Sequence, residues 1–234
     1  MTSQTFTGNI LNVVQKPQRL PNPNRCLDKS PLYRPSDSVT LFDSKLKQLI
    51  ADMTVTMHAA SGIGIAAPQV GVNQAIFIID FPKPEENQRY RRLTNHSEFL
   101  APVPSQLFIN PIITKASDET VSFWHACLSC NGHPRGKIAS YKWLEFKAQK
   151  PNGKIFEGRV EKMAAIIFQH EFRHLLGLTY LERATEVLDS ETLFRAYDNG
   201  TMPFFSTEQG VDPHMIGDYQ IGESMEEYQK RLFG

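Results

Sequence analysis

Apolar residues recur at helical spacing in two long stretches of the chain. The first stretch, between Asp43 and Ala60, contains Leu46, Leu49, Ile50, Met53 and Met57. The second, between Glu161 and Leu178, contains Met163, Ile166, Ile167, His170, His174, Leu175 and Leu178. Residues three and four positions apart share one face of a helix, so the pattern predicts a helix over each stretch. A shorter helix is predicted over 225–233.

Runs rich in β-branched and aromatic residues predict strands over 75–79, 107–113 and 143–148. The turn residues at 150–153 predict a hairpin from the third run to a strand over 154–156. The glycine-rich segment 62–69 stands between the first helix and the first strand, and we expect it to be a connection between them. From 186 to 224 the scattered glycines and prolines predict no further element.

Three regions lie outside the predicted core elements, and the first two of them show no hydrophobic period. Residues 1–35 are rich in proline and polar residues and are expected to form an extended N-terminal arm; residues 81–106 are expected to form a surface insertion. Residues 186–234 are expected to be a C-terminal extension. The chain has 234 residues, of which 41% are apolar and 21% charged. We therefore expect one domain over 1–234 that carries these three regions.

Charge and cysteine content narrow the function classes. Lys and Arg number 25 and Asp and Glu number 25, so the net charge is zero and no nucleic-acid partner is indicated. No apolar run approaches the roughly 18 residues that span a bilayer, and the first residues lack a secretory signal. We therefore expect no membrane partner and a cytoplasmic location. The three cysteines, Cys26, Cys127 and Cys130, are an odd number, which favours a reduced compartment and a metal or catalytic role.

The second predicted helix contains a metal-binding pattern. In His170-Glu171-Phe172-Arg173-His174 the two histidines lie one helical turn apart on the same face, where both imidazoles can bind one ion. Glu171 lies one step around the helix and can reach water activated by the ion without being a ligand, which suits a general base. The alternative is a helix whose histidines are purely structural.

A catalytic metal of this kind requires a third protein ligand. The helix pattern is not followed by a third histidine, because position 180 is Tyr180. Cys127 is a natural candidate, since a thiolate binds Fe(II) or Zn(II) strongly. The alternative for Cys127 is a buried structural cysteine. A further alternative is a redox-sensing protein in which Cys127 and Cys130 form a CxxC motif.

Three segments resemble the peptide deformylase family in the same order along the chain. Residues 62–69 (Gly-Ile-Gly-Ile-Ala-Ala-Pro-Gln) are similar to its glycine motif, Cys127-Leu128-Ser129 to its cysteine motif, and Gln169-His170-Glu171 with His174 to its helix motif. The resemblance covers roughly residues 10–185 and leaves out the C-terminal residues. It implies an α+β fold in which antiparallel sheets pack around a central helix that carries the two histidines.

The resemblance also implies a role for each site residue. Cys127, His170 and His174 become ligands of one divalent metal ion, Fe(II) in the cell, with Zn(II) or Ni(II) as substitutes. Glu171 becomes the acid-base residue, and the Gln69 amide and the Leu128 backbone N–H stabilise the oxyanion. Gly64 lets the substrate backbone approach closely, and the methionine pocket is lined by Ile63, Ile166 and Ile167, for which plain core is the alternative.

The sequence departs from the family at three places. His125-Ala126 stands where Glu-Gly is usual before the cysteine, so Ala126 adds a methyl group facing the peptide. In a rough alignment, the position of the arginine that commonly pairs with that glutamate falls on an uncharged residue near Ser140, so we expect both halves of the ion pair to be lost. Arg173 replaces an acidic residue inside the helix motif. We expect these changes to alter substrate preference.

The expected function is removal of the N-formyl group from the N-terminal methionine of nascent polypeptides, with release of formate. The implied partners are N-formylmethionyl peptides and the ribosome near the nascent-chain exit. Two alternatives stay open at this point. One is a metallo-amidase or peptidase that acts on a different amide. The other is a metal-bound relative with weak or no deformylase activity.

Overall fold

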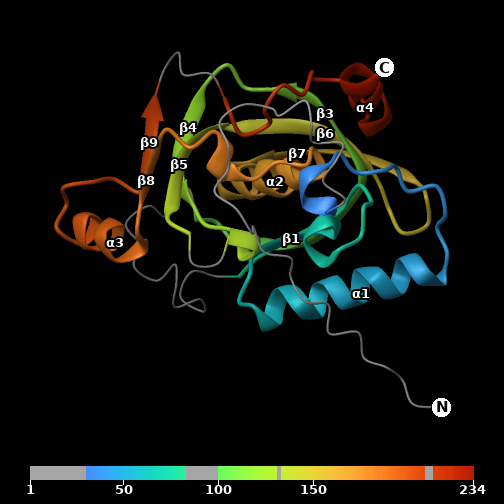
Figure 1. Cartoon of the computed structure of the whole chain (residues 1–234), viewed down its shortest axis with the longest axis horizontal. Helices are drawn as coiled ribbons and strands as arrows, with labels where there is room; N and C mark the ends of the chain where they lie inside the picture. Colours follow the sequence, from blue (N-terminus) through green and yellow to red (C-terminus); the bar gives the residue numbers. More distant parts are fainter. Residues whose placement is uncertain (1–29, 83–99, 131–132, 209–212) are drawn as a thin grey trace.

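Helix α2 (Lys162–Leu175) lies at the centre of the fold in the computed structural model of the chain, which describes residues 30–82, 100–130, 133–208 and 213–234 (Figure 1). The helix packs against strands of both sheets. Every side chain from Ala165 to Leu175 is buried. Because buried polar groups need partners, the five polar residues in this stretch must be held by specific contacts. The predicted helix over 161–178 is confirmed, with a somewhat earlier end.

The first sheet contains five antiparallel strands in the order β1-β2-β3-β6-β7. Their bounds are Gly64–Ala66, Ile76–Phe81, Val103–Ala116, Trp143–Gln149 and Ile155–Glu161. The predicted strands and the hairpin between β6 and β7 are confirmed. Two boundaries were wrong. Residues 62–69 are not a plain connection, because they form β1 and the 3-10 helix η3 (Ala67–Val70). Phe81 and Val103 pair in the sheet, so the expected insertion is shorter than 81–106, and 83–99 lie outside the described residues.

The second sheet was not predicted at all. It has the order β8-β5-β4-β9, with β4 at Thr120–His125, β5 at Arg135–Tyr141, β8 at Glu186–Leu188 and β9 at Phe205–Glu208. All six residues of β4 are buried, so the strand shows none of the alternation that marks a half-exposed strand. The expected α+β fold with antiparallel sheets around the histidine-bearing helix is nevertheless confirmed.

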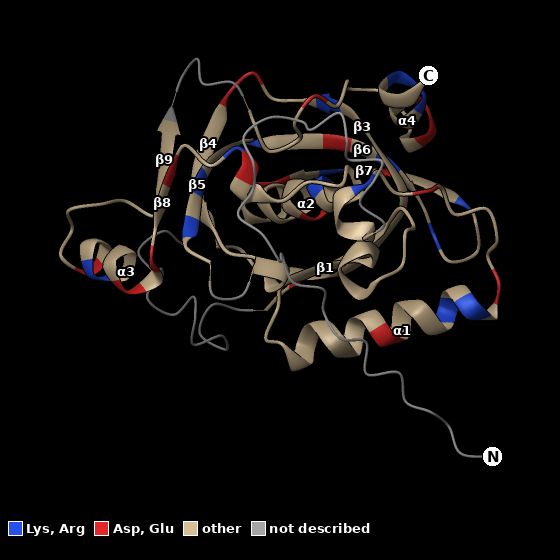
Figure 2. Ribbon diagram, in the orientation of Figure 1, with Lys and Arg blue, Asp and Glu red and all other residues tan. Residues whose placement is uncertain are grey.

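Three further helices lie around this centre (Figure 1). Helix α1 (Ser44–Ala59) is capped at its N-terminus by Asp43, whose carboxylate accepts from the N–H groups of Lys45 and Leu46 at 3.0 Å. Helix α4 (Met225–Phe233) matches its prediction, whereas α3 (Ser190–Asp198) was not predicted. No helix within the described ranges has the length and apolar character that crossing a bilayer requires. Blue and red segments are interspersed along the elements in Figure 2.

Aromatic side chains fix α2 against the first sheet. The Phe77 and Phe108 rings stack at 4.8 Å, and Phe168 of α2 meets both edge-on at 4.9 and 5.0 Å. All three side chains are fully buried. Truncating one such ring typically costs about 3–5 kcal/mol, so this cluster holds the helix in a defined position relative to β2 and β3.

Arg173 ties α2 to the C-terminal part of the chain. Its side chain is 1% exposed, its Nε donates to the Thr179 carbonyl at 2.5 Å, and one terminal nitrogen donates to the His214 and Met215 carbonyls at 2.8 Å. Glu182 lies 3.5 Å from the other terminal nitrogen. The contacts of Arg173 are thus internal. Its expected effect on substrate preference has no direct basis in this structure.

Candidate metal centre

Cys127, His170 and His174 meet at one point beside α2. Each offers one ligand atom, and these three atoms all lie within 4.8 Å of one another. Cys127 Sγ and His174 Nε2 are 3.2 Å apart. Cys127 follows the end of β4, while the histidines extend from successive turns of α2. No other group of three or more His, Cys, Asp or Glu residues in the described ranges comes together in this way.

The donor set fits a divalent transition metal. A soft thiolate with two imidazoles suits Fe(II), Zn(II) or Ni(II), and three protein ligands leave a position open for water or substrate. Burial raises the pKa of the Cys127 thiol, and a hydrogen bond between the thiols of Cys127 and Cys130 adds to the rise. A bound cation opposes that effect, because the thiolate is the form that binds metal.

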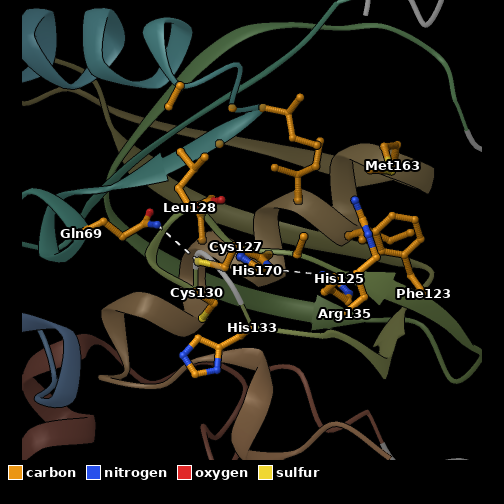
Figure 3. A pocket seen from close by; sticks show the side chains of 18 of the residues that line it. Gln69, Phe123, His125, Cys127, Leu128, Cys130, His133, Arg135, Met163 and His170 are labelled. Carbon is orange, nitrogen blue, oxygen red and sulfur yellow. Dashed lines mark hydrogen bonds between the residues drawn. The ribbon is translucent and has the colours of Figure 1, made fainter. Parts of the chain in front are cut away.

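His125 contacts the metal-site histidine His170. The two Nδ1 atoms are 3.1 Å apart and the rings stack at 5.2 Å (Figure 3). One Nδ1 donates and the other accepts, which leaves Nε2 of His170 for a metal. Burial, followed by the charge of His170, holds the pKa of His125 well below its usual range. The neutral imidazole of His125 thus orients the metal-binding His170, a role that a carboxylate or a backbone carbonyl often has.

The cleft contains an arginine, Arg135, while the expected loss of the ion-pair arginine near Ser140 stays a prediction. Ser140 is buried in β5 opposite Val121 and does not line the cleft. Arg135, at the start of the same strand, does line it, and its charge also lowers the pKa of His125. Arg135 belongs to none of the three motifs, so the sequence analysis did not single it out.

Glu171 is a buried carboxyl group at the edge of the cleft. Its side chain is 4% exposed, Oε2 has no hydrogen-bond partner within the described residues, and burial raises its pKa well above the usual value. A methyl group on Gly64 would collide with this carboxylate. The expected reason for Gly64 was close approach of substrate. The structure shows that Glu171 itself already requires the glycine.

Gln69 presents its amide nitrogen to the cysteine segment (Figure 3). Its Oε1 accepts from the Ala66 N–H at 2.8 Å, so the carboxamide has a fixed orientation. Its Nε2 donates to Ser129 Oγ at 3.2 Å and lies 3.5 Å from Cys127 Sγ. Leu128 is the first residue of the 3-10 helix η6 (Leu128–Cys130), so its N–H is outside that helix's own hydrogen bonds.

A cleft of about 620 Å³ joins these groups. Of the predicted site residues, ten line it: Ile63, Gly64, Gln69, Ala126, Cys127, Leu128, Ile166, Ile167, His170 and Glu171. The structure does not place His174 in this wall, and its side chain is 1% exposed behind Cys127. Ile166 and Ile167 belong to the hydrophobic core and also line the cleft. The interpretations of these residues as pocket lining and as plain core are therefore compatible.

Several lining residues were missed by the sequence analysis. Phe123 and Met163 lie next to predicted residues, but Ser190 and Phe194 belong to α3, a helix without any motif. Cys130 also lines the cleft, as a free and buried cysteine. The CxxC segment forms η6 between two antiparallel strands and does not open a helix of a βαβ unit, which argues against a redox motif.

Comparison with known proteins agrees with this geometry. A sequence model of the polypeptide deformylase family matches residues 24–189. The chain belongs to the polypeptide deformylase family. A peptide deformylase from a Roseiflexus species is 35% identical over 172 residues, which cover 72% of this chain and 88% of that protein. The expected family and enzyme class, a metal-dependent deformylase, are thereby confirmed.

Solved deformylase structures share the fold. The crystal structure of the Thermotoga maritima peptide deformylase has a TM-score of 0.57 and 31% identity, covering 68% of this chain and 93% of that one. A peptide deformylase from Acinetobacter baumannii, described with Met-Ala-Ser bound, has a TM-score of 0.59 and 26% identity, covering 75% of this chain and 99% of that one. Helix α3 begins directly after the segment matched to the deformylase family.

Proposed function

We propose that this chain hydrolyses the formamide bond of N-formylmethionyl peptides at the centre formed by Cys127, His170 and His174. The observation that carries the proposal is the convergence of these three ligand atoms within 4.8 Å, in a cleft that also contains the buried Glu171. A divalent ion held there supplies Lewis acidity and makes water nucleophilic at neutral pH. We take the native ion to be Fe(II), as the resemblance to the family implies, with Zn(II) and Ni(II) as substitutes.

Glu171 moves the proton in this scheme. A carboxyl group whose pKa is raised by burial can accept a proton from the attacking water and give it up again near neutral pH. It passes that proton to the amine nitrogen as the bond to the formyl carbon breaks. The formamide and one water thus yield formate and a free peptide N-terminus.

Gln69 and Leu128 stabilise the negative charge that grows on the formyl oxygen. The Gln69 amide is held in place by Ala66 and Ser129, so its N–H groups do not have to reorient during the reaction. The Leu128 backbone N–H supplies the second donor. Fixed donors of this kind are worth roughly 10²–10³ in rate each.

The apolar wall of the cleft suits a methionine side chain. Ile63, Met163, Ile166 and Ile167 all line it, and Ala126 adds an exposed methyl group. The Acinetobacter relative described with Met-Ala-Ser bound supports a peptide as the ligand. The cytoplasm and the neighbourhood of the ribosome remain predictions from the sequence.

Formate release from formyl-Met-Ala-Ser tests the proposal. We expect the protein, purified without air, to release one formate per peptide, to lose this activity on chelation, and to regain it with Fe(II). Acetyl-Met-Ala-Ser and unblocked peptides with internal bonds serve as controls. Cleavage of an internal bond instead of the formamide would support the metallopeptidase alternative. Bound metal without any formate release would support the inactive relative.

A further inference from the structure

Helix α3 forms one wall of the catalytic cleft although it lies outside the segment matched to the deformylase family. Ser190 and Phe194 of this helix line the same cleft as Cys127 and Glu171. The family match ends at residue 189. The wall is therefore a feature of the C-terminal extension, and nothing in the three sequence motifs accounts for it.

A second hollow lies along α3. It has a volume of about 470 Å³ and is lined by Ser190, Glu191, Phe194, Arg195, Asp198 and Asn199. Ser190 and Phe194 line both hollows. The two spaces therefore adjoin at these residues. Apart from Ser190 and Phe194, the second hollow is lined by polar, exposed side chains of the helix.

The position of α3 relative to the metal centre is fixed by the second sheet. β8, before the helix, pairs with β5, and β9, after it, pairs with β4, the strand that leads into Cys127. The Asp189 carboxylate caps the helix by accepting from the Thr192 N–H at 2.8 Å, and Leu193 is fully buried. Figure 1 shows α3 beside β8, on the side of the molecule away from α4.

The Phe194 ring is held in place at the junction of the two hollows. It stacks with Phe204 at 5.6 Å, and the Arg135 guanidinium lies 5.1 Å from its centre. Arg135 Nε also donates to Ser190 Oγ at 3.2 Å, which ties the first turn of α3 to strand β5. A fixed aromatic ring loses little conformational entropy when a ligand packs on it, so it is an effective apolar platform.

We propose that α3 and its hollow bind the peptide residues that follow the formylated methionine, with Phe194 as the main contact. The proposal rests on the proposed deformylase function, because it takes the peptide to enter at the metal centre. The occupant is an extended peptide, since the hollow shares two lining residues with the substrate cleft and lies along the surface of one helix. The extension then determines how strongly substrate length contributes to kcat/KM.

A peptide-length series tests this directly. We expect kcat/KM of the metal-loaded enzyme to rise from formyl-Met-Ala to formyl-Met-Ala-Leu-Ala. In Phe194→Ala the ratio of kcat/KM with formyl-Met-Ala-Leu-Ala to kcat/KM with formyl-Met-Ala should fall roughly tenfold, equivalent to about 1.4 kcal/mol. Thr192→Ala is the matched control, because Thr192 is exposed on the same helix and lines neither hollow. An unchanged length gain in Phe194→Ala would overturn the proposal.

A cross-linking experiment on the wild-type protein covers the case in which Phe194→Ala does not fold. Product peptides with a photoreactive benzophenone side chain at the third or fourth residue should label residues 190–199, as located by mass spectrometry. Labelling confined to other segments would refute the assignment. Absence of formate release from every peptide would refute the proposed function instead, and labelling would still report whether peptide lies along α3.

Discussion

The cleft is bounded by two regions that differ in how their residues are held. On the α2 side, the reacting groups are buried polar side chains whose neighbours leave little freedom: Glu171 packs on Gly64, and the Gln69 amide is bound at both ends. On the α3 side, the lining is an aromatic ring followed by exposed side chains. The first region is suited to chemistry common to all substrates, whereas the second can only distinguish between them.

This difference predicts how substitutions should behave. A change on the α2 side removes a ligand, a proton carrier or an oxyanion donor, so it lowers the rate for every formylated substrate. A change on the α3 side leaves the reacting groups intact, so it should lower the rate more for longer peptides than for short ones. The variants below are ordered by the size of the effect expected on that basis.

His174→Ala should have the largest effect. It removes one of three ligands, so we expect metal affinity and formate release both to fall by more than the ~10²-fold that loss of an outer-shell partner can cost. Elemental analysis after dialysis and the formate assay measure the two effects. His58→Ala is the control, since His58 pairs with Asp80 on the exposed side of α1. Unchanged metal content in His174→Ala would remove His174 from the ligand set.

Glu171→Gln should lower turnover while the metal stays bound. Glutamine has the same shape but cannot carry the proton, so kcat with formyl-Met-Ala and with longer peptides should fall equally, by at least ~10²-fold. A loss confined to long peptides would mean that Glu171 acts in substrate binding and not in proton transfer. Metal content measured on the same samples shows whether the loss is chemical.

Gln69→Leu should cost a comparable ~10² or more in kcat, because it removes an oxyanion donor. The substitution also leaves the Ala66 N–H without its acceptor, so we expect about 1–3 kcal/mol lower stability, measured by denaturant unfolding. Ser129→Ala is informative beside it, since it removes one partner of the amide and keeps the amide itself. A Gln69→Leu enzyme with wild-type kcat would exclude the oxyanion role.

Arg173→Met tests the link between α2 and residues 214 and 215 and should act mainly on stability. It removes the donors to the Thr179, His214 and Met215 carbonyls, and loss of a buried, hydrogen-bonded charge typically costs about 3 kcal/mol or more. We expect a lower unfolding free energy and earlier proteolytic cleavage after residue 200. The exposed pair of Lys230 and Glu226 provides the control, because Lys230→Ala removes only a surface ion pair and should leave the unfolding free energy nearly unchanged. If Arg173→Met were as stable as Lys230→Ala, Arg173 would not stabilise the contact between α2 and the C-terminal part of the chain.

The sequence predicted the α2 region well because its information is local. Two histidines four residues apart lie on one face of a helix, and the apolar period around them predicts that helix. The contact of His125 with His170 and the contacts of Arg173 with residues 214 and 215 span 41–45 positions in the chain. No local pattern encodes such pairs, so His125 and Arg173 could be noted as unusual but not explained.

The α3 region was missed for a related reason. The helix has nine residues and a single fully buried side chain, Leu193, which is too little to establish a period. β4 is buried at every position and β5 contains glycine and charged residues, so neither alternates in the way that marks a strand. The strands that position α3 could therefore not be predicted from a local pattern. The place of Phe194 in the cleft wall is seen only in the folded structure.

Titration of the metal-free protein with Co(II) tests the central assignment most directly, because a cobalt–thiolate bond gives a charge-transfer band in the near ultraviolet. We predict saturation at one Co(II) per chain, with a thiolate band that persists in Cys130→Ala and disappears in Cys127→Ala. Cys130 is the matched control, since it is a buried cysteine three positions along the same segment and lies outside the ligand set. A band that depends on Cys130, or the absence of stoichiometric binding, would contradict the metal centre described above.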